Sequence, residues 1–455
     1  MRRHTLKRRV LLLTAALALS ALVTSACGNN DGGGEGSPTT PGGADALPGQ
    51  MQGVSDTEIR IGALLPLSNS PAAAWGIAIR RGMQAYYDYI NDQGGIYGRK
   101  IKLFVGDSQY SGPFAAEAIR KLVEQDKIFA LQGSLGTAAH SAVWKYLEER
   151  GIPDMYLLTG NAKWTVPVVK TRFTGLPDYS TEGRILARYV FQNYDGKKLG
   201  IIAQNDDYGK EGEQGMKQGL EEQGADMDVA VEYYDETQSE VTAQVQRLKA
   251  DNVDVMAFWG GPVQASNMIK TARQLLNWDV PMIINGTNAL EIVAQLAGYD
   301  NIEGTVSAML GHQAWETNIP GIAKRKELMA KYAPDLPFDN ISLIGWAVSE
   351  GVTGLLKQAG PNLTRESFLN AAESICKYVS DTSLVPTSTS PTDHRPIEAE
   401  VLVRAVVDRS TDPPTFRWQP FGDPIEFEST TDCVVPTPPP DATSQPGPRS
   451  QGQSQ

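Results

Sequence analysis

The stretch Phe129-Ala-Leu-Gln-Gly-Ser-Leu-Gly-Thr-Ala-Ala-His140 decides the fold, because it predicts a strand, a sharp turn and a helix in succession. Residues 128–131 are apolar and typical of a short buried strand, and two glycines then allow the chain to turn. Ser134 or Thr137 is expected to cap the helix by accepting a first-turn backbone N–H. Unpaired N–H groups and the helix dipole favour an anion, so a carboxylate is expected to bind at this turn.

Apolar strands and amphipathic helices alternate on both sides of this stretch. Strands are expected at 58–66, 100–105, 128–131, 154–159, 198–203, 228–234, 253–259 and 280–284, and later helices at 238–250, 263–277 and 288–297. Such alternation is typical of parallel sheets covered on both faces. The pattern restarts after Phe173 and has too many strands for one sheet of ordinary width. The predicted fold class is therefore α/β, with two doubly wound α/β lobes.

The two ends of the chain differ in composition from the part between them. Basic residues, an apolar run at 10–23 and small residues at 24–26 precede Cys27, as in a lipoprotein signal peptide over 1–27. Cys27 is therefore expected to carry a lipid, and ordinary secretion with a spare thiol is the alternative. Residues 28–52 are polar and rich in glycine and predict a flexible linker, and the Pro/Ser-rich residues 431–455 predict a disordered tail.

The bulk composition fits a globular protein and excludes some partners. The chain has 455 residues, of which 41% are hydrophobic and 21% charged, and its net charge of −12 argues against a nucleic-acid partner. Besides Cys27 there are two cysteines, Cys376 and Cys433, and an oxidising compartment would let them form a disulfide, with two buried thiols as the alternative. The four histidines show no ligand spacing, so neither a metal nor a cofactor is expected.

Ligands of parallel α/β sheets bind beyond the carboxyl ends of the strands, so the loops that follow each strand are the candidate site. Motifs for a phosphate loop, a zinc helix and a hydrolase nucleophile elbow are absent from the sequence. The protein is therefore not expected to be an enzyme. A secreted hydrolase that uses Ser134 with His312 or His394 remains an alternative.

Several of these segments occur in the order found in a known family. They are Ile59-Arg-Ile-Gly-Ala-Leu-Leu-Pro-Leu67, Tyr89-Ile-Asn-Asp-Gln-Gly-Gly-Ile-Tyr-Gly-Arg99, Gly133-Ser-Leu-Gly-Thr137 and Asp207-Tyr-Gly209. In this order the chain resembles the type I periplasmic binding proteins of the branched-chain amino acid (Leu/Ile/Val-binding) family, which are receptors of ABC importers. The resemblance implies two lobes joined by three hinge crossovers. Lobe 1 is expected at 53–174 plus 307–360, and lobe 2 at 175–306 plus 361–430.

The resemblance also implies which residues bind the solute. Ser134, Thr137 and Gly136 are expected to bind a carboxylate, with Thr159, Gly160 and Asn161 completing that pole. Tyr208 is expected to close onto the solute from the other lobe. Further candidates are Trp75, Gly261 and Thr287, with Trp164 and Trp259 as other possible walls.

An amine on the solute would need an opposite charge, because a desolvated ammonium is costly to leave unpaired. The loop Asn285-Gly-Thr-Asn288 has no acid where one is expected. Asp178 or Asp206 could substitute, and otherwise the solute would lack an amine.

The predicted function is capture of a small carboxylate-bearing solute, such as an amino acid or a related acid or amide, for delivery to an ABC transporter permease. The predicted location is the extracytoplasmic face of the cell membrane, through the lipid on Cys27. An extracellular sensor that signals to a partner is the alternative within the same fold.

Overall fold

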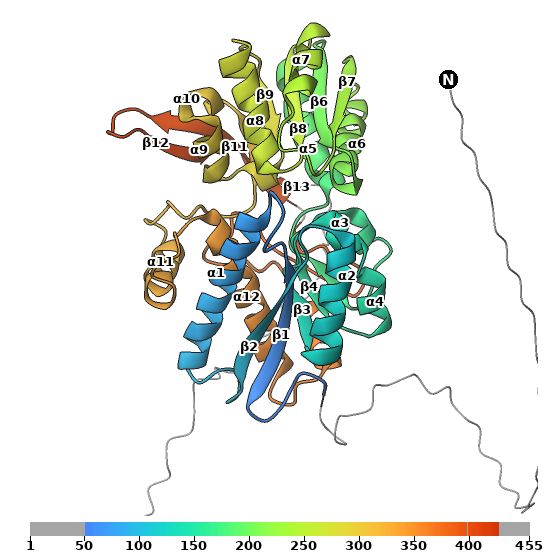
Figure 1. Cartoon of the computed structure of the whole chain (residues 1–455), viewed down its shortest axis with the longest axis vertical. Coiled ribbons are helices and arrows are strands. Elements are labelled where there is room, and N and C mark those ends of the chain that lie inside the picture. Colours follow the sequence, from blue (N-terminus) through green and yellow to red (C-terminus); the bar gives the residue numbers. More distant parts are fainter. Residues whose placement is uncertain (1–50, 398, 427–455) are drawn as a thin grey trace, which may run out of the picture. The chain divides into compact units, whose positions relative to one another are not determined.

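The computed structural model describes residues 51–397 and 399–426, which Figure 1 draws in colour. The predicted signal peptide with Cys27, the linker up to residue 50 and the tail 431–455 lie outside these residues. Met51 and Gln52 belong to the folded part, contrary to the predicted linker boundary, because Gln52 Nε2 donates to the backbone oxygen of Val123 at 3.2 Å. Within the described ranges, no helix has the length and apolarity needed to span a membrane.

The first sheet has five parallel strands and belongs to lobe 1. Their order is β2-β1-β3-β4-β5. Their bounds are β1 Glu58–Leu65, β2 Lys100–Asp107, β3 Ala130–Gln132, β4 Asp154–Leu157 and β5 Arg172–Thr174. All five strands therefore end at the same edge of the sheet.

The second sheet belongs to lobe 2 and combines parallel strands with an antiparallel edge. Its order is β12-β11-β10-β9-β8-β6-β7, and β13 pairs with β11. The parallel strands are β6 Leu199–Gln204, β7 Val229–Tyr234, β8 Val255–Trp259, β9 Met282–Ile284 and β10 Val306–Met309. The antiparallel strands are β11 Ala399–Asp408, β12 Thr415–Pro420 and β13 Ile425–Glu426. This antiparallel edge was not predicted from the sequence, and neither were the parallel strands β5 and β10.

Helices cover the faces of both sheets (Figure 1). Those of lobe 1 are α1 Ala73–Asp92, α2 Gly112–Arg120, α3 Thr137–Ser141, α4 Trp144–Glu149, α11 Pro320–Tyr332, α12 Asn340–Ala359 and α13 Arg365–Ala372. Those of lobe 2 are α5 Tyr179–Tyr194, α6 Asp207–Glu222, α7 Thr242–Ala250, α8 Pro262–Lys270, α9 Glu291–Ala297 and α10 Tyr299–Ile302. The helix expected from residue 238 therefore begins at Thr242, and the one expected to reach 277 becomes a π-helical turn after Lys270.

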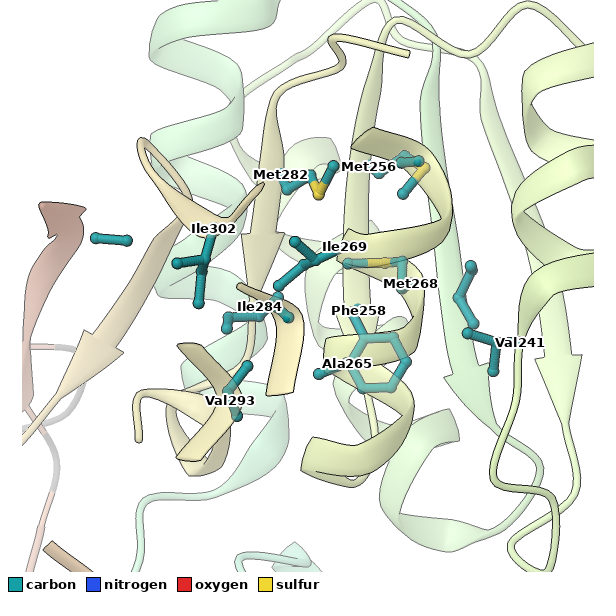
Figure 2. Close-up of a cluster of buried hydrophobic side chains, with 14 of the residues drawn as sticks. Val241, Met256, Phe258, Ala265, Met268, Ile269, Met282, Ile284, Val293 and Ile302 are labelled. Atoms are coloured by element: carbon teal, nitrogen blue, oxygen red, sulfur yellow. The ribbon is translucent and has the colours of Figure 1, made fainter. Parts of the chain in front are cut away.

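Strand β8 shows why the strands of lobe 2 are continuously apolar. Its side chains alternate between two buried clusters, with Met256 and Phe258 in one and Val255, Ala257 and Trp259 in the other. Figure 2 shows the first cluster, in which side chains of β8 and β9 face those of α8. A strand buried on both faces has no solvent side to make polar, so periodicity two disappears from its sequence.

The helix α12 belongs to lobe 1 because it packs directly against α1. A Cβ on Gly82 would lie 2.1 Å from the Ser342 oxygen, and one on Gly345 would lie 2.1 Å from the Ile79 oxygen. Only glycine at both positions lets the two helix backbones approach this closely. Beside this contact, the rings of Tyr86 and Trp346 meet edge to face at 5.0 Å between centroids.

Two of the predicted lobe boundaries differ from the structure. The boundary at 307 falls inside β10, which pairs with β9 and β11 in the second sheet. The boundary at 361 places α13 in lobe 2, whereas Phe368 and Leu369 of α13 are buried in the core of lobe 1. Both errors arise because an apolar segment shows that it is buried but not against which sheet.

Candidate functional site

A cavity of about 70 Å³ lies where loops that follow strands of both sheets meet. Lobe 1 contributes Pro71, Ala72, Trp75, Tyr110, Leu135, Gly136 and Leu158. Lobe 2 contributes Tyr179, Gln204, Tyr208, Glu236, Gly260, Gly261, Pro262, Val263, Gln264 and Thr287. The walls are mostly apolar and aromatic, and no Lys, Arg or His lies among these lining residues. The cavity therefore suits a small solute with an apolar body and few polar groups.

Tyr110 forms much of the lobe 1 wall. It lies in the loop after β2 in a left-handed conformation, with φ +56°, and its ring packs on Gly136. A Cβ on Gly136, whose φ is +104°, would lie 2.6 Å from the Tyr110 ring. Burial raises the pKa of Tyr110 and the Asp206 carboxylate raises it further, whereas hydrogen bonding with Gln204 of lobe 2 lowers it. Tyr110 is therefore a neutral phenol that reaches from one lobe to the other.

Tyr208 organises the lobe 2 wall. Its hydroxyl donates to the backbone oxygen of Gly260 at 3.0 Å, accepts from Asn285 Nδ2 at 2.7 Å and bonds to Thr287 Oγ1 at 2.6 Å. Its ring lies 4.6 Å from that of Tyr179 between centroids. Three strand-end loops are thereby joined through one hydroxyl, so this wall is preorganised.

Besides its tyrosines, the cavity wall contains one ionisable side chain, the carboxyl group of Glu236. Burial raises the pKa of Glu236, and the nearby Asp206 and Asp235 carboxylates raise it further. Asp206 does not face the cavity as a free charge, because its side chain caps α6 by accepting from the N–H groups of Tyr208 and Gly209. Glu236 is therefore the cavity carboxyl group that a positively charged group of a solute could contact.

The predicted carboxylate pole lies mostly behind the cavity. Of its residues only Gly136 lines the wall, whereas Ser134, Thr137 and Thr159 are almost completely buried. The hydroxyls of Thr137 and Thr159 bond to each other at 2.6 Å. Gly136 is the N-cap of α3 and no side chain caps this helix, so the predicted capping by Ser134 or Thr137 is wrong. The hydroxyls of Thr137 and Thr159 are thus already paired with each other, whereas Ser134 Oγ is buried without a hydrogen-bond partner.

Three further predicted site residues face other partners. Gly160 packs against the crossover into lobe 2, where a Cβ would lie 2.1 Å from the Pro177 oxygen. Asn161 Nδ2 donates to the Asp207 oxygen of lobe 2 at 3.0 Å. The Asp178 carboxylate pairs with Arg395 at 3.0 Å, so its charge is already compensated. None of the three lines the cavity.

Trp75, Tyr208, Gly261 and Thr287 do line the cavity, as does Gly136. Trp164 and Trp259 are fully buried core residues instead. Five other residues that line the cavity were not predicted as site residues from the sequence: Tyr110, Tyr179, Gln204, Glu236 and Gln264. The signal for Glu236 was its position two residues after the strand expected at 228–234.

Among the described residues, neither the hydrolase alternative nor a metal site has the side-chain arrangement that it would need. A hydrolase would need a hydrogen bond between Ser134 and a histidine, but His312 pairs with Glu316, and His394 bonds to the backbone oxygens of Val169 and Arg172. Residues 51–397 and 399–426 contain no group of three His, Cys, Asp or Glu side chains arranged for a metal ion. Cys376 is disulfide-bonded, and its predicted partner Cys433 lies outside the described residues.

Comparison with known proteins connects this fold to one family. The family model described as "Periplasmic binding protein" matches residues 58–410. A Leu/Ile/Val-binding protein of Rhizobium johnstonii is 25% identical over 74% of this chain and 87% of its own length. A Leu/Ile/Val-binding protein homolog of Brucella melitensis is 24% identical over 67% of this chain and 80% of its own length.

Solved structures agree with the fold. A fatty acid ABC transporter substrate-binding protein from Thermomonospora curvata superposes with a TM-score of 0.72 at 23% identity, over 82% of this chain and 94% of that one. A branched-chain amino acid ABC transporter structure from Thermus thermophilus with bound valine gives 0.71 at 17% identity, over 82% and 96%. The family resemblance drawn from the sequence is thus confirmed: the chain belongs to the type I periplasmic binding proteins, a family of extracytoplasmic substrate-binding proteins.

Proposed function

We propose that this protein captures a small carboxylate-bearing solute between its two lobes and delivers it to the permease of an ABC importer. The observation that carries the proposal is the cavity itself, whose walls come from strand-end loops of both sheets. A solute held there contacts both lobes only when they are closed. Its binding energy then shifts the hinge equilibrium towards the closed form, which a permease can recognise.

The cavity walls indicate the chemistry of the solute. Trp75, Tyr110 and Tyr208 offer apolar and aromatic surface for its body. The polar end would lie beside Leu135 and Gly136, and the Ser134 hydroxyl behind this part of the wall has no hydrogen-bond partner. Valine and fatty acids, named for the two similar structures, both carry a carboxylate next to an apolar body.

Glu236 is the carboxyl group that would pair with an ammonium group if the solute carries one. It lines the cavity on the lobe 2 side, whereas Asp178 is paired with Arg395 and Asp206 caps a helix. An ammonium near Glu236 would stabilise the ionised carboxylate and lower its pKa, and a solute without an amine would leave the pKa raised. Replacement Glu236→Gln should therefore weaken an amino acid much more than its deaminated analogue.

A thermal-shift screen of the purified protein tests the proposal. The panel contains amino acids, short-chain and long-chain carboxylates, and amides. A solute at a hundredfold excess over its dissociation constant stabilises the fold by about 2.7 kcal/mol, which is readily detected. The shift should disappear in Trp75→Ala and persist in the control Trp315→Ala, whose side chain is exposed outside this cavity. Solutes that stabilise both variants equally would refute the site, and a panel without any hit would refute the solute class.

The proposed site of action is the outer face of the cell membrane, with Cys27 carrying the lipid. A Cys27→Ser variant should then leave the membrane fraction when cells are separated into membrane and soluble material. Retention of this variant in the membrane fraction would contradict the anchor without affecting the solute site.

A further inference from the structure

One cluster of contacts between the lobes lies outside the solute cavity. Residues 161–163, in the loop after β4 of lobe 1, meet the first turns of α6 in lobe 2. Asn161 Nδ2 donates to the backbone oxygen of Asp207 at 3.0 Å, and Lys163 Nζ pairs with the Asp207 carboxylate oxygen Oδ2 at 2.5 Å. The Ala162 N–H donates to Glu211 Oε1 at 2.9 Å. We call this cluster the clasp, and all of its partners belong to opposite lobes.

We propose that the clasp makes lobe closure a proton-uptake step, in which Glu211 binds the proton. The inference rests on the two-lobe closure of the proposed function, but it concerns residues that do not touch the solute. Its readout needs no solute, so a failed solute screen and a failed clasp can be told apart.

The geometry around Glu211 carries the inference. Its Oε1 accepts from the Ala162 N–H at 2.9 Å, whereas its Oε2 is buried without a hydrogen-bond partner. The cation of the clasp, Lys163, is engaged by Asp207 and by Ser141 Oγ at 2.9 Å. A carboxylate in this position loses hydration without gaining a full counter-charge, so the closed lobes favour its neutral form.

The other charged groups packed against Glu211 have opposing effects. Together they raise its pKa to about 8: burial raises the pKa most, the Ala162 N–H lowers it, the Asp178 carboxylate raises it, and the Ser180 N–H and Lys163 lower it. Asp178 is itself paired with Arg395. Opening would separate α6 from residues 161–163 and expose Glu211 to more water, which would move its pKa back towards the 4.5 of an ordinary glutamic acid.

The sign of the pH effect follows from these two values. Between about pH 4.5 and 8 the closed form holds one proton more than the open form. The contribution of Glu211 to closure is therefore complete below pH 4.5 and is lost as the pH rises through 8. At its steepest, one linked proton changes the closed-to-open ratio by about tenfold for each pH unit. Solute would be held more tightly in acidic than in alkaline surroundings.

Small-angle X-ray scattering of the solute-free protein between pH 5 and 8.5 tests this inference, because opening enlarges the radius of gyration. The wild type should expand as the pH rises. Glu211→Gln, whose amide oxygen can still accept from Ala162, should stay compact throughout. The matched control Glu221→Gln changes an exposed acid farther along the same helix and should behave as the wild type does.

Two results would overturn the proposal: a wild-type radius that does not change with pH, or the same pH dependence in Glu211→Gln. The comparison also separates Glu211 from Glu182, Glu236 and Asp206, whose pKa values are raised elsewhere in lobe 2. If Glu211→Gln fails to fold, Asp207→Asn provides a second test. It removes the partner of Lys163 and should lower the closed fraction at every pH while keeping the wild-type slope, and an unchanged closed fraction would contradict the clasp.

Discussion

Removal of the Tyr208 hydroxyl, in Tyr208→Phe, perturbs the lobe 2 wall with the least change of shape. The phenyl ring keeps its place against Tyr179, but the three hydrogen bonds to Gly260, Asn285 and Thr287 are lost. Each partner retains another bond, because Asn285 Nδ2 also donates to Thr287 Oγ1 at 2.7 Å and the Gly260 oxygen also accepts from Asn288 Nδ2 at 2.8 Å. No partner is left without a bond, so the loss should be about 1–2 kcal/mol of unfolding free energy.

Urea denaturation followed by circular dichroism measures this loss as a shift of the midpoint at constant slope. The matched control is Tyr233→Phe, which removes one exposed hydroxyl that donates to Glu213 Oε2 at 3.0 Å. The control should lose less than about 0.5 kcal/mol, as is usual for surface substitutions. Equal stability of Tyr208→Phe and the wild type, or equal losses in the two variants, would refute the proposed preorganisation of this wall.

Three other perturbations have defined outcomes. Glu182 and Glu400 are buried together and burial raises both pKa values, that of Glu182 to about 7, so the unfolding free energy should fall as the pH rises from about 5 to 7. Glu400→Gln should flatten this fall in urea midpoints measured against pH, and an unchanged slope would contradict the shared burial. Gly136→Ala should lower the melting temperature and alter solute affinity, because its Cβ meets the Tyr110 ring at a φ of +104°. Cys376→Ser should lose about 2–4 kcal/mol of stability in protein from an oxidising compartment, and an unaltered melting temperature would show that the disulfide contributes little.

Much of the fold could be predicted because its signals are local. Alternation of apolar strands with amphipathic helices predicted two α/β lobes, and eight of the ten parallel strands lie within a few residues of their expected positions, whereas β5 and β10 were not predicted. The antiparallel edge formed by β11 and β12 was not predicted, because its pairing joins the far C-terminal part to β10. The same limit applies to α13, whose burial in lobe 1 depends on long-range packing.

For the candidate site, too, local signals could be predicted from the sequence and long-range contacts could not. The strand-end rule selected the loops that hold Trp75, Gly136, Tyr208, Gly261 and Thr287, all of which line the cavity. It could not distinguish residues on the wall from those one layer behind, such as Thr137 and Thr159, because a hydrogen bond between two loops leaves no local pattern.

Contacts between the lobes were equally hidden in the sequence. Asn161 follows a strand as a solute-binding residue would, yet it bonds to Asp207 of the opposite lobe. The partner of Glu211 is a backbone N–H, which every residue but proline has. Side-chain type alone therefore did not reveal the clasp.

Titration calorimetry with the most stabilising solute, on wild type and on variants of the two opposite walls, tests the central claim most directly. Trp75→Ala alters the lobe 1 wall, and Thr287→Val alters the lobe 2 wall without changing its size. We predict that the wild type binds one solute per chain and that both variants lose affinity, because the solute touches both lobes in the closed form. Full affinity in either variant would mean that the solute binds one lobe only, which would contradict capture between the two.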